Sequence, residues 1–241
     1  IMTELLVVID QKCKEHKIPD WRSAGKLLGA IRHKGFIPWD DDADINMMRK
    51  DYDRFILLIE EYLPEPYKVQ SAEHNTHGLH NWCKIAYMDD YEWIDWQGNW
   101  TKGLTIDIFP FDYVSDSDKL SVIGKITNRI ASIRRPLKVT NAKTLLQTLI
   151  NKMELHRLYA RIAKKTNTVT YGVETPYYGW TFFKVDEIFP LTEGSFEGHE
   201  LSIPINSHEC LIKEYGDDMQ IPEESKRISH MKQLRLSIKN K

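Results

Sequence analysis

The spacing of apolar positions predicts three helices and one short strand in the first quarter of the chain. The first helix covers residues 5–17, and its apolar stripe consists of Leu5, Leu6, Ile9 and Cys13. A turn of small residues at 23–25 leads into a second helical segment at 26–33. Residues 43–48 alternate as a strand does, and residues 50–62 return to helical spacing. This mixture is typical of an α+β domain.

The rest of the chain alternates between strand-rich and helical stretches. Residues 67–114 are β-rich, with strands expected at 67–69, 82–88 and 104–109. Residues 117–166 predict two basic amphipathic helices, and the buried stripe of the second consists of Leu146, Leu149, Ile150, Met153, Leu158 and Ile162. Residues 180–206 are again β-like, while residues 209–215 and those from 223 onward favour helix.

Composition restricts the chain to one sizeable globular unit. Its 241 residues are 41% hydrophobic, which suits one large domain or a core domain with a helical annex. The three cysteines are widely spaced and form no CxxC pair, which favours a reducing compartment over a disulfide scaffold. Neither a signal-peptide pattern nor a membrane-spanning apolar run is visible, so we expect a cytoplasmic protein.

Charge is balanced over the whole chain but distributed unevenly along it. The net charge is −2, yet residues 119–165 hold twelve Lys and Arg against a single acid, a local charge of +11. Such a segment suits an anionic partner, although a solvated basic helix face produces the same pattern. The remaining residues carry −13, which argues against a nucleic-acid-binding module.

Four aspartates in the stretch FIPWDDDADI, residues 36–45, are the strongest candidate chemistry. Carboxylates this close raise one another's proton affinity, so the cluster needs either a cation or full solvation. Because side chains alternate along a strand, an extended segment at 42–48 puts Asp42 and Asp44 on one face, and Ala43, Ile45 and Met47 on the face that can enter the core. Paired carboxylates suit a hard divalent cation, with Asp40 as a further candidate ligand and Asp41 facing away.

A third carboxylate is expected from Asp107. It is the single charge in the apolar strand LTIDIF, residues 104–109, where a surface position is hard to explain. If this strand lies beside residues 42–48, Asp107 joins Asp42 and Asp44 around the cation. The alternative is an acidic turn and an unrelated aspartate on an edge strand.

The turn at residues 23–25 is a candidate phosphate site. A turn of small residues that runs into a helix presents backbone N–H groups to an anion. Arg32 and His33, later in the same segment, add donors that can balance charge on a transferring phosphoryl group. A glycine turn before a helix is common, so this feature alone discriminates little.

Taken together, these segments resemble the signature of the LicD family, named for bacterial phosphocholine transferases and distantly related to animal fukutin-type proteins. GKLLGAIRHKGFIPWDDDADI at 25–45, followed by MRKDYDRF at 48–55, is close to the family pattern GTLLGAxRHxGFIPWDDDxDI. The IDIFP element matches at 106–110, and the C-terminal FEG…P…YGD…LP run matches between residues 196 and 222. The resemblance covers residues 1 to about 230.

The resemblance implies an α+β fold with a nucleotidyltransferase-like core, in which helices flank a mixed β-sheet. It also implies a helical insertion and a C-terminal annex. We therefore expect a single LicD-like domain at 1–241, with a core at 1–115, a basic helical segment at 116–170 and a C-terminal part at 171–241.

In the family pattern, a turn of glycine and small residues, a D-x-D strand and one further aspartate form the site. The turn corresponds to Gly25, Lys26 and Gly29, which the resemblance assigns to donor binding, and the carboxylates are the three already identified. Lys26 is the one departure, because the family usually has Thr or Ser there. A long cation in place of a hydroxyl either contacts a phosphate as a point charge or blocks the usual nucleotide pose.

The activity implied is transfer of a phospho-alcohol group from a CDP-linked donor, with release of CMP. The acceptor is a hydroxyl of a cell-surface glycan, such as lipopolysaccharide or teichoic acid, or of its polyprenyl-linked precursor. Mg²⁺ or Mn²⁺ on Asp42, Asp44 and Asp107 would bridge the diphosphate. Asp107 is also the candidate to draw the acceptor's proton, while Arg32 and His33 would steady the leaving CMP.

Aromatic residues favour choline as the alcohol of this donor. Six Trp and Tyr crowd one β-rich stretch: Trp82, Tyr87, Tyr91, Trp93, Trp96 and Trp100. Aromatic faces hold a quaternary ammonium well, which makes Trp93 and Trp96 candidates for donor binding in CDP-choline. The same rings can instead belong to the core or stack on a sugar acceptor, so CDP-ribitol and CDP-glycerol stay open as donors.

Two other function classes and one location remain open. A true nucleotidyltransferase would use the same carboxylates and release pyrophosphate from a nucleoside triphosphate. A non-catalytic binding protein on this fold is less favoured, and Lys26 is the only hint of one. The basic segment 119–165 fits peripheral contact with an anionic inner membrane surface, although its period also fits packing on the core.

Overall fold

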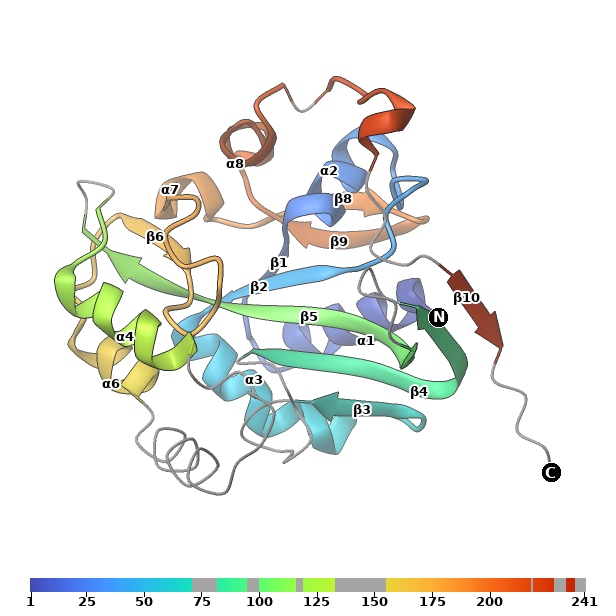
Figure 1. Cartoon of the computed structure of the whole chain (residues 1–241), viewed down its shortest axis with the longest axis horizontal. Coiled ribbons are helices and arrows are strands. Elements are labelled where there is room, and N and C mark those ends of the chain that lie inside the picture. Colours follow the sequence, from blue (N-terminus) through green and yellow to red (C-terminus); the bar gives the residue numbers. More distant parts are fainter. Residues whose placement is uncertain are drawn as a thin grey trace.

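The computed structural model describes residues 1–70, 82–94, 100–115, 119–132, 155–217, 219–227 and 233–236. It is an α+β structure in which a curled, mixed β-sheet is flanked by helices (Figure 1). The predicted α+β class and the mixed sheet with flanking helices are therefore confirmed. The nucleotidyltransferase-like character of the core stays a prediction at this point.

The described elements largely follow the pattern of apolar spacing in the sequence. The helices are α1 (Met2–Glu15), α2 (Ala24–Arg32), α3 (Arg49–Tyr62), α4 (Val122–Ser132), α6 (Leu155–Ile162), α7 (Val185–Ile188) and α8 (Ser207–Tyr215). The strands are β1 (Asp20–Arg22), β2 (Asp44–Met48), β3 (Tyr67–Gln70), β4 (Cys83–Ile94), β5 (Trp100–Val114), β6 (Thr168–Tyr171), β7 (Phe183–Lys184), β8 (Thr192–Phe196), β9 (His199–Ile203) and β10 (Gln233–Leu236). A 3₁₀ turn spans Glu224–Lys226.

The main sheet places the predicted aspartate strands next to each other. Among the described strands its order is β1-β2-β5-β4-β10, with β3 also on β4, β6 on β5 and β7 on β6. β2 and β5 run parallel with Asp44 opposite Asp107, and the other pairs in this sheet are antiparallel. The expected adjacency of the two strands is therefore confirmed.

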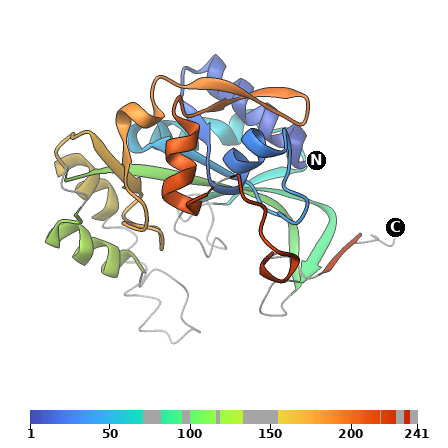
Figure 2. The same cartoon turned by 90° about the horizontal axis from the view of Figure 1, so that it is seen from above.

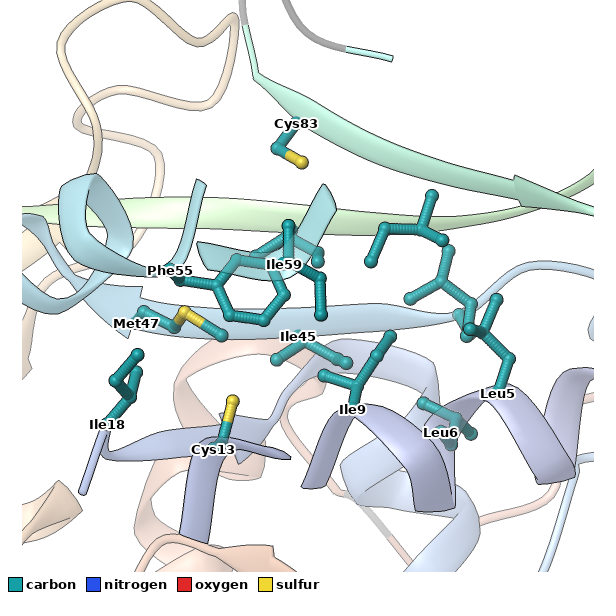
Figure 3. Close-up of a cluster of buried hydrophobic side chains, with 14 of the residues drawn as sticks. Leu5, Leu6, Ile9, Cys13, Ile18, Ile45, Met47, Phe55, Ile59 and Cys83 are labelled. Atoms are coloured by element: carbon teal, nitrogen blue, oxygen red, sulfur yellow. The ribbon is translucent and has the colours of Figure 1, made fainter. Parts of the chain in front are cut away.

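One face of this sheet is covered by α1 and α3. Ile45 and Met47 of β2 point toward Ile9 of α1 and toward Phe55 and Ile59 of α3 (Figure 3). Each of these side chains is at most 2% exposed, and burying one contributes about 1.5–3 kcal/mol. The predicted apolar stripe of the first helix lies in this core, as do the core-facing residues of the aspartate strand.

The opposite face of the sheet carries the polar candidates. Because side chains alternate along a strand, Asp44 of β2 and Asp107 and Phe109 of β5 point away from α1 and α3. α2 and α8 contact each other on this side (Figures 1 and 2). The second hydrophobic cluster, which includes Phe109 and Leu27 of α2, packs on this face of the sheet.

The C-terminal half of the chain is joined to the same sheet. β6 extends β5, with Tyr171 opposite Phe111, and the β8–β9 hairpin packs against α1 and β1. Phe196 and Leu201 of this hairpin belong to the α1–α3 core. The expected division at residues 115 and 170 stays a prediction.

A buried arginine ties three segments together. Arg49, at the start of α3, donates two hydrogen bonds of 2.9 Å to Asp112 of β5 and two of 2.6 Å to Glu174, which follows β6. Burial alone would raise the pKa of Glu174, but the charge and hydrogen bonds of Arg49 outweigh it and lower the pKa to about 2. The arginine that follows the D-x-D strand in the family motif thus has a structural role here.

Two expectations for the helices are wrong. Leu158 and Ile162 of α6 are 53% and 61% exposed, and the helix instead buries His156 and Tyr159. The reason is that Tyr159 packs edge-on against Tyr178, with their hydroxyl oxygens 2.7 Å apart, which turns the apolar stripe outward. The other predicted stripe residues, Leu146, Leu149, Ile150 and Met153, lie outside the described residues.

The segment after residue 223 is the second of these corrections. It is expected to be helical, but its described part contains only the 3₁₀ turn before β10. β10 pairs antiparallel with β4, so an available sheet edge determines its conformation rather than its local sequence.

Candidate active site

A cavity of about 360 Å³ opens on the polar face of the sheet. Asp40, Asp42, Asp44 and Asp107 all line it, together with Gly25 at the start of α2. Five residues predicted from the sequence for metal or donor binding therefore surround one space. That volume falls within the range of small-molecule sites.

Backbone pairing and one glycine bring the carboxylates together. Because β2 and β5 are parallel, Asp44 and Asp107 are Cα partners, and the Asp107 N–H donates to the Ala43 carbonyl at 2.8 Å. A Cβ on Gly25 would stand 2.5 Å from Oδ2 of Asp40. The missing side chain at Gly25 is thus what lets Asp40 approach α2.

Electrostatic repulsion within the cluster is only partly compensated. Burial, followed by the charges of Asp42 and Asp107, raises the pKa of Asp44 well above its usual value. Burial raises the pKa of Asp40 to about 6, even though Lys26 acts in the opposite direction. The cluster therefore favours either bound protons or an additional cation.

Two lysines supply part of the missing positive charge. Lys26 is fully buried and forms ion pairs with Asp40 and, at 3.5 Å, with Asp42. Lys84 of β4 lies opposite Asp107 in the sheet, and its Nζ is 2.5 Å from Oδ1 of that residue. Sequence reasoning missed Lys84, although it is the lone charge in the apolar run CKIA, just as Asp107 is in LTIDIF.

The donor set suits a hard divalent cation in its chemistry. Asp42, Asp44 and Asp107 offer oxygen ligands, and their repulsion remains incompletely neutralised. Within the described ranges, however, no three His, Cys, Asp or Glu side chains are gathered tightly enough to hold a metal ion as they stand. Mg²⁺ or Mn²⁺ on these residues and on Asp40 stays a prediction.

Lys26, which is buried behind Asp40, and three other predicted residues, Gly29, Arg32 and His33, do not line the cavity. The Arg32 side chain donates to the Gln220 carbonyl at 3.0 Å and to His33 Nδ1 at 3.3 Å. Gly29 is where α2 approaches the Gly35 carbonyl too closely for any side chain. Their roles in holding a donor or steadying a leaving group remain predictions.

Most of the predicted aromatic stretch lies away from the cavity or outside the described residues. Trp96 and the side chain of Trp93 are not described. Tyr87 packs against Tyr67, with ring centroids 5.5 Å apart, where β3 pairs with β4. Of the rings in this stretch that the structure describes, that of Trp82 approaches the cavity and lies 5.4 Å from that of Phe109.

Sequence reasoning missed a second group of residues that line the cavity: Phe109, Tyr171, Tyr177, Trp180, Glu214 and Tyr215. Three of them fall in the ring-rich stretch YGVETPYYGW at 171–180, Tyr215 opens the YGD element, and Glu214 directly precedes it. The richness of this stretch in aromatic residues was therefore visible in the sequence. The pairing of β6 with β5 brings this stretch to the aspartates, and no local sequence pattern predicts that pairing.

Comparison with known proteins supports the same region. Residues 17–127 match the family described as LicD/FKTN/FKRP, nucleotidyltransferase domain. The chain is 27% identical over 238 residues to the lipopolysaccharide cholinephosphotransferase LicD of Haemophilus influenzae, an alignment covering 90% of this chain and 88% of that protein.

Two shorter matches are to uncharacterized rickettsial proteins. One, from Rickettsia typhi, is 38% identical over 56 residues, which are 23% of this chain and 18% of that protein. The other, from Rickettsia prowazekii, is 33% identical over 75 residues, which are 31% of this chain and 26% of that protein. From the family match and the long alignment with the Haemophilus protein, we conclude that residues 17–127 form a domain of the LicD family.

Proposed function

We propose that this chain transfers phosphocholine from CDP-choline to a hydroxyl of a cell-surface glycan or its lipid-linked precursor, with release of CMP. The observation that carries the proposal is the cavity in which Asp42, Asp44 and Asp107 converge. The long alignment with a lipopolysaccharide cholinephosphotransferase supports the group transferred and the class of acceptor.

The chain's own residues can hold the reacting groups in this mechanism. Lys26 and Lys84 carry positive charge at the carboxylates, where a donor diphosphate would otherwise be repelled. Asp107 is our candidate acceptor for the proton of the attacking hydroxyl, and its position on the cavity wall next to Asp44 supports this role. Mg²⁺ or Mn²⁺, when bound by Asp42, Asp44 and Asp107, would neutralise negative charge between the donor and the protein.

Product analysis tests this reaction against its alternatives. Purified protein with Mn²⁺, CDP-choline and a lipopolysaccharide-type acceptor should release CMP and leave phosphocholine on the glycan. Pyrophosphate release from CTP would instead indicate a nucleotidyltransferase. Turnover of CDP-ribitol or CDP-glycerol without turnover of CDP-choline would identify a different donor. If none of these donors and no CTP were turned over, a non-catalytic binding protein would be favoured.

Lys26 offers a prediction about metal binding that does not depend on catalysis. Lys26→Met removes the buried cation beside Asp40 and Asp42, so the metal-free protein should melt at a lower temperature. The Tm increase produced by Mn²⁺ should be larger than in the wild type, because the ion then replaces the missing charge. Differential scanning fluorimetry checks both shifts.

The matched control for Lys26 is Lys125→Met, which changes an exposed lysine on α4. Its Mn²⁺-induced shift should equal that of the wild type. An equal shift in Lys26→Met as well would count against a metal site at these aspartates.

We also propose peripheral contact with an anionic membrane surface at the cytoplasmic side. None of the described helices has both the length and the apolarity to cross a membrane. Val122, Lys125, Ile126 and Arg129 of α4 recur at helical spacing, and the two apolar ones are 73% and 53% exposed. Exposed apolar and basic side chains on one stripe suit an anionic leaflet. Residues 133–154 of the predicted basic segment lie outside the described part.

Vesicle flotation measures this contact. The protein should float with vesicles that contain phosphatidylglycerol and remain in solution with phosphatidylcholine alone. Val122→Asp/Ile126→Asp should reduce flotation several-fold, because two apolar contacts are replaced by charges of the wrong sign. Equal flotation of this variant and the wild type would assign the membrane contact, if any, to another surface.

A further inference from the structure

A continuous aromatic surface leads away from the carboxylates along the cavity wall. Phe109 lies two residues after Asp107 on β5 and therefore on the same face. Its ring meets those of Tyr171 and Tyr177 edge-on, with centroids 5.6 and 5.5 Å away. Tyr177 in turn stacks on Trp180 at 5.4 Å, with only 20° between the rings. The rings thus begin beside Asp107 and extend outward.

One carboxyl group stands against this aromatic surface. Glu214, near the end of α8, lines the cavity and accepts a hydrogen bond of 3.1 Å from the Tyr171 hydroxyl. Its neighbour Lys213 also lines the cavity but is ion-paired with Glu187, with 2.5 Å between Nζ and Oε2. Within the described part of the chain Glu214 has no ion-pair partner, so the cavity contains an uncompensated acid surrounded by rings.

The environment of Glu214 disfavours a bare negative charge. Burial raises the pKa of Glu214 to about 7, although the Tyr171 hydroxyl and the Ala24 N–H both donate to the carboxyl group. A cation bound nearby would reverse that penalty. A neutral polyol would not, because it supplies hydroxyl donors but no positive charge.

We propose that Glu214, Tyr171, Tyr177 and Trp180 form a subsite for the quaternary ammonium group of the donor. A quaternary ammonium has no N–H to donate, so it is held by aromatic faces and by a carboxylate at van der Waals distance. This subsite deepens the proposed function, since it rests on the donor phosphates lying at Asp42, Asp44 and Asp107.

The spacing along β5 agrees with a short choline chain. Two residues of a strand span roughly 6–7 Å, so Phe109, whose ring contacts Tyr171 and Tyr177 of the subsite, stands about that far from Asp107. A phosphate at the carboxylates and an ammonium group at the rings can be joined over such a distance by a two-carbon linker. The longer, hydroxyl-rich chain of ribitol would face rings that offer it few hydrogen bonds.

Glu214 also has a structural contact that the test must separate from ligand binding. Its carboxyl group accepts from the Ala24 N–H, at the start of α2. Glu214→Gln keeps an acceptor for that N–H and for the Tyr171 hydroxyl but removes the charge. The matched control is Glu209→Gln, an exposed residue five positions earlier on the same helix.

Titration with tetramethylammonium and with phosphocholine, followed by tryptophan fluorescence and calorimetry, tests the subsite without any turnover. Glu214→Gln should weaken binding of both probes about tenfold, and Glu209→Gln should leave it unchanged. Trp180→Ala should weaken both probes to a similar degree, and Trp180→Phe should restore part of the loss. Absence of binding by the wild type, or equal binding by Glu214→Gln and the wild type, would overturn the subsite.

A parallel comparison of donors separates this subsite from the proposed function. Glu214→Gln should raise the Kd for CDP-choline about tenfold and leave the Kd for CDP-glycerol unchanged. If tetramethylammonium binds in a Glu214-dependent way but no CMP is released, the proposed transfer is wrong and the subsite stands. If CMP is released from CDP-choline with the same KM in Glu214→Gln and wild type, the transfer stands and the subsite is wrong.

Discussion

Asp44→Asn should lower the rate of CMP release from CDP-choline by at least about 100-fold, the scale seen when a preorganised charge is removed from an active site. Asp44 is the carboxylate that lies directly beside Asp107. Burial and the neighbouring carboxylates raise the free energy of its ionised form. A neutral amide would keep the shape of the site but lose an oxygen ligand and the charge that a cation would balance. Initial rates under saturating donor provide the measurement.

The folded state should not suffer from the same change. Because burial and repulsion raise the pKa of Asp44, its ionised form opposes folding near neutral pH, and the amide removes that cost. We therefore expect Asp44→Asn to melt at the same or a higher temperature than the wild type. Asp41→Asn, which changes an aspartate that does not line the cavity, is the control and should keep most of the activity. Full activity in Asp44→Asn would contradict the proposed site.

Arg49→Met should lower the free energy of unfolding by about 3–5 kcal/mol, the cost of leaving buried charges without their partner. Asp112 and Glu174 are at most 3% exposed and share the guanidinium of Arg49. Both carboxylates would then have to be protonated or hydrated in the folded state. Urea denaturation followed by circular dichroism measures the loss.

Two further variants make this prediction specific to the buried network. Lys50→Met removes the exposed neighbouring charge on α3 and should change stability by less than about 0.5 kcal/mol. The triple variant Arg49→Met/Asp112→Asn/Glu174→Gln has no unpaired charge and should recover part of the loss. Equal stability of Arg49→Met and the wild type would show that the network contributes nothing to the fold.

The sequence indicated the centre of the candidate site because two local signals agreed. Alternation along residues 42–48 put Asp42 and Asp44 on one face, and Asp107 was the lone charge in an apolar strand. Parallel pairing of β2 and β5 then brings these aspartates to one cavity. The buried face of the first helix could be predicted equally well, since its apolar residues recur at helical spacing on a single face.

What the sequence did not indicate depends on contacts between distant segments. Lys84 reaches Asp107 through the register of β4 on β5, which no local pattern encodes. The cavity's rings come largely from 171–180, which reaches the site through β6, rather than from the aromatic stretch at 82–100. For α6, the pairing of Tyr159 with Tyr178 overrides the apolar stripe.

The most direct test of the central claim is one ³¹P NMR measurement of the reaction products. Wild-type protein with Mn²⁺, CDP-choline and a lipopolysaccharide-type acceptor should yield CMP and a new glycan phosphodiester in equal amounts, and Asp44→Asn should yield neither. Equal product formation by Asp44→Asn, or a phosphodiester formed without CMP, would contradict the account.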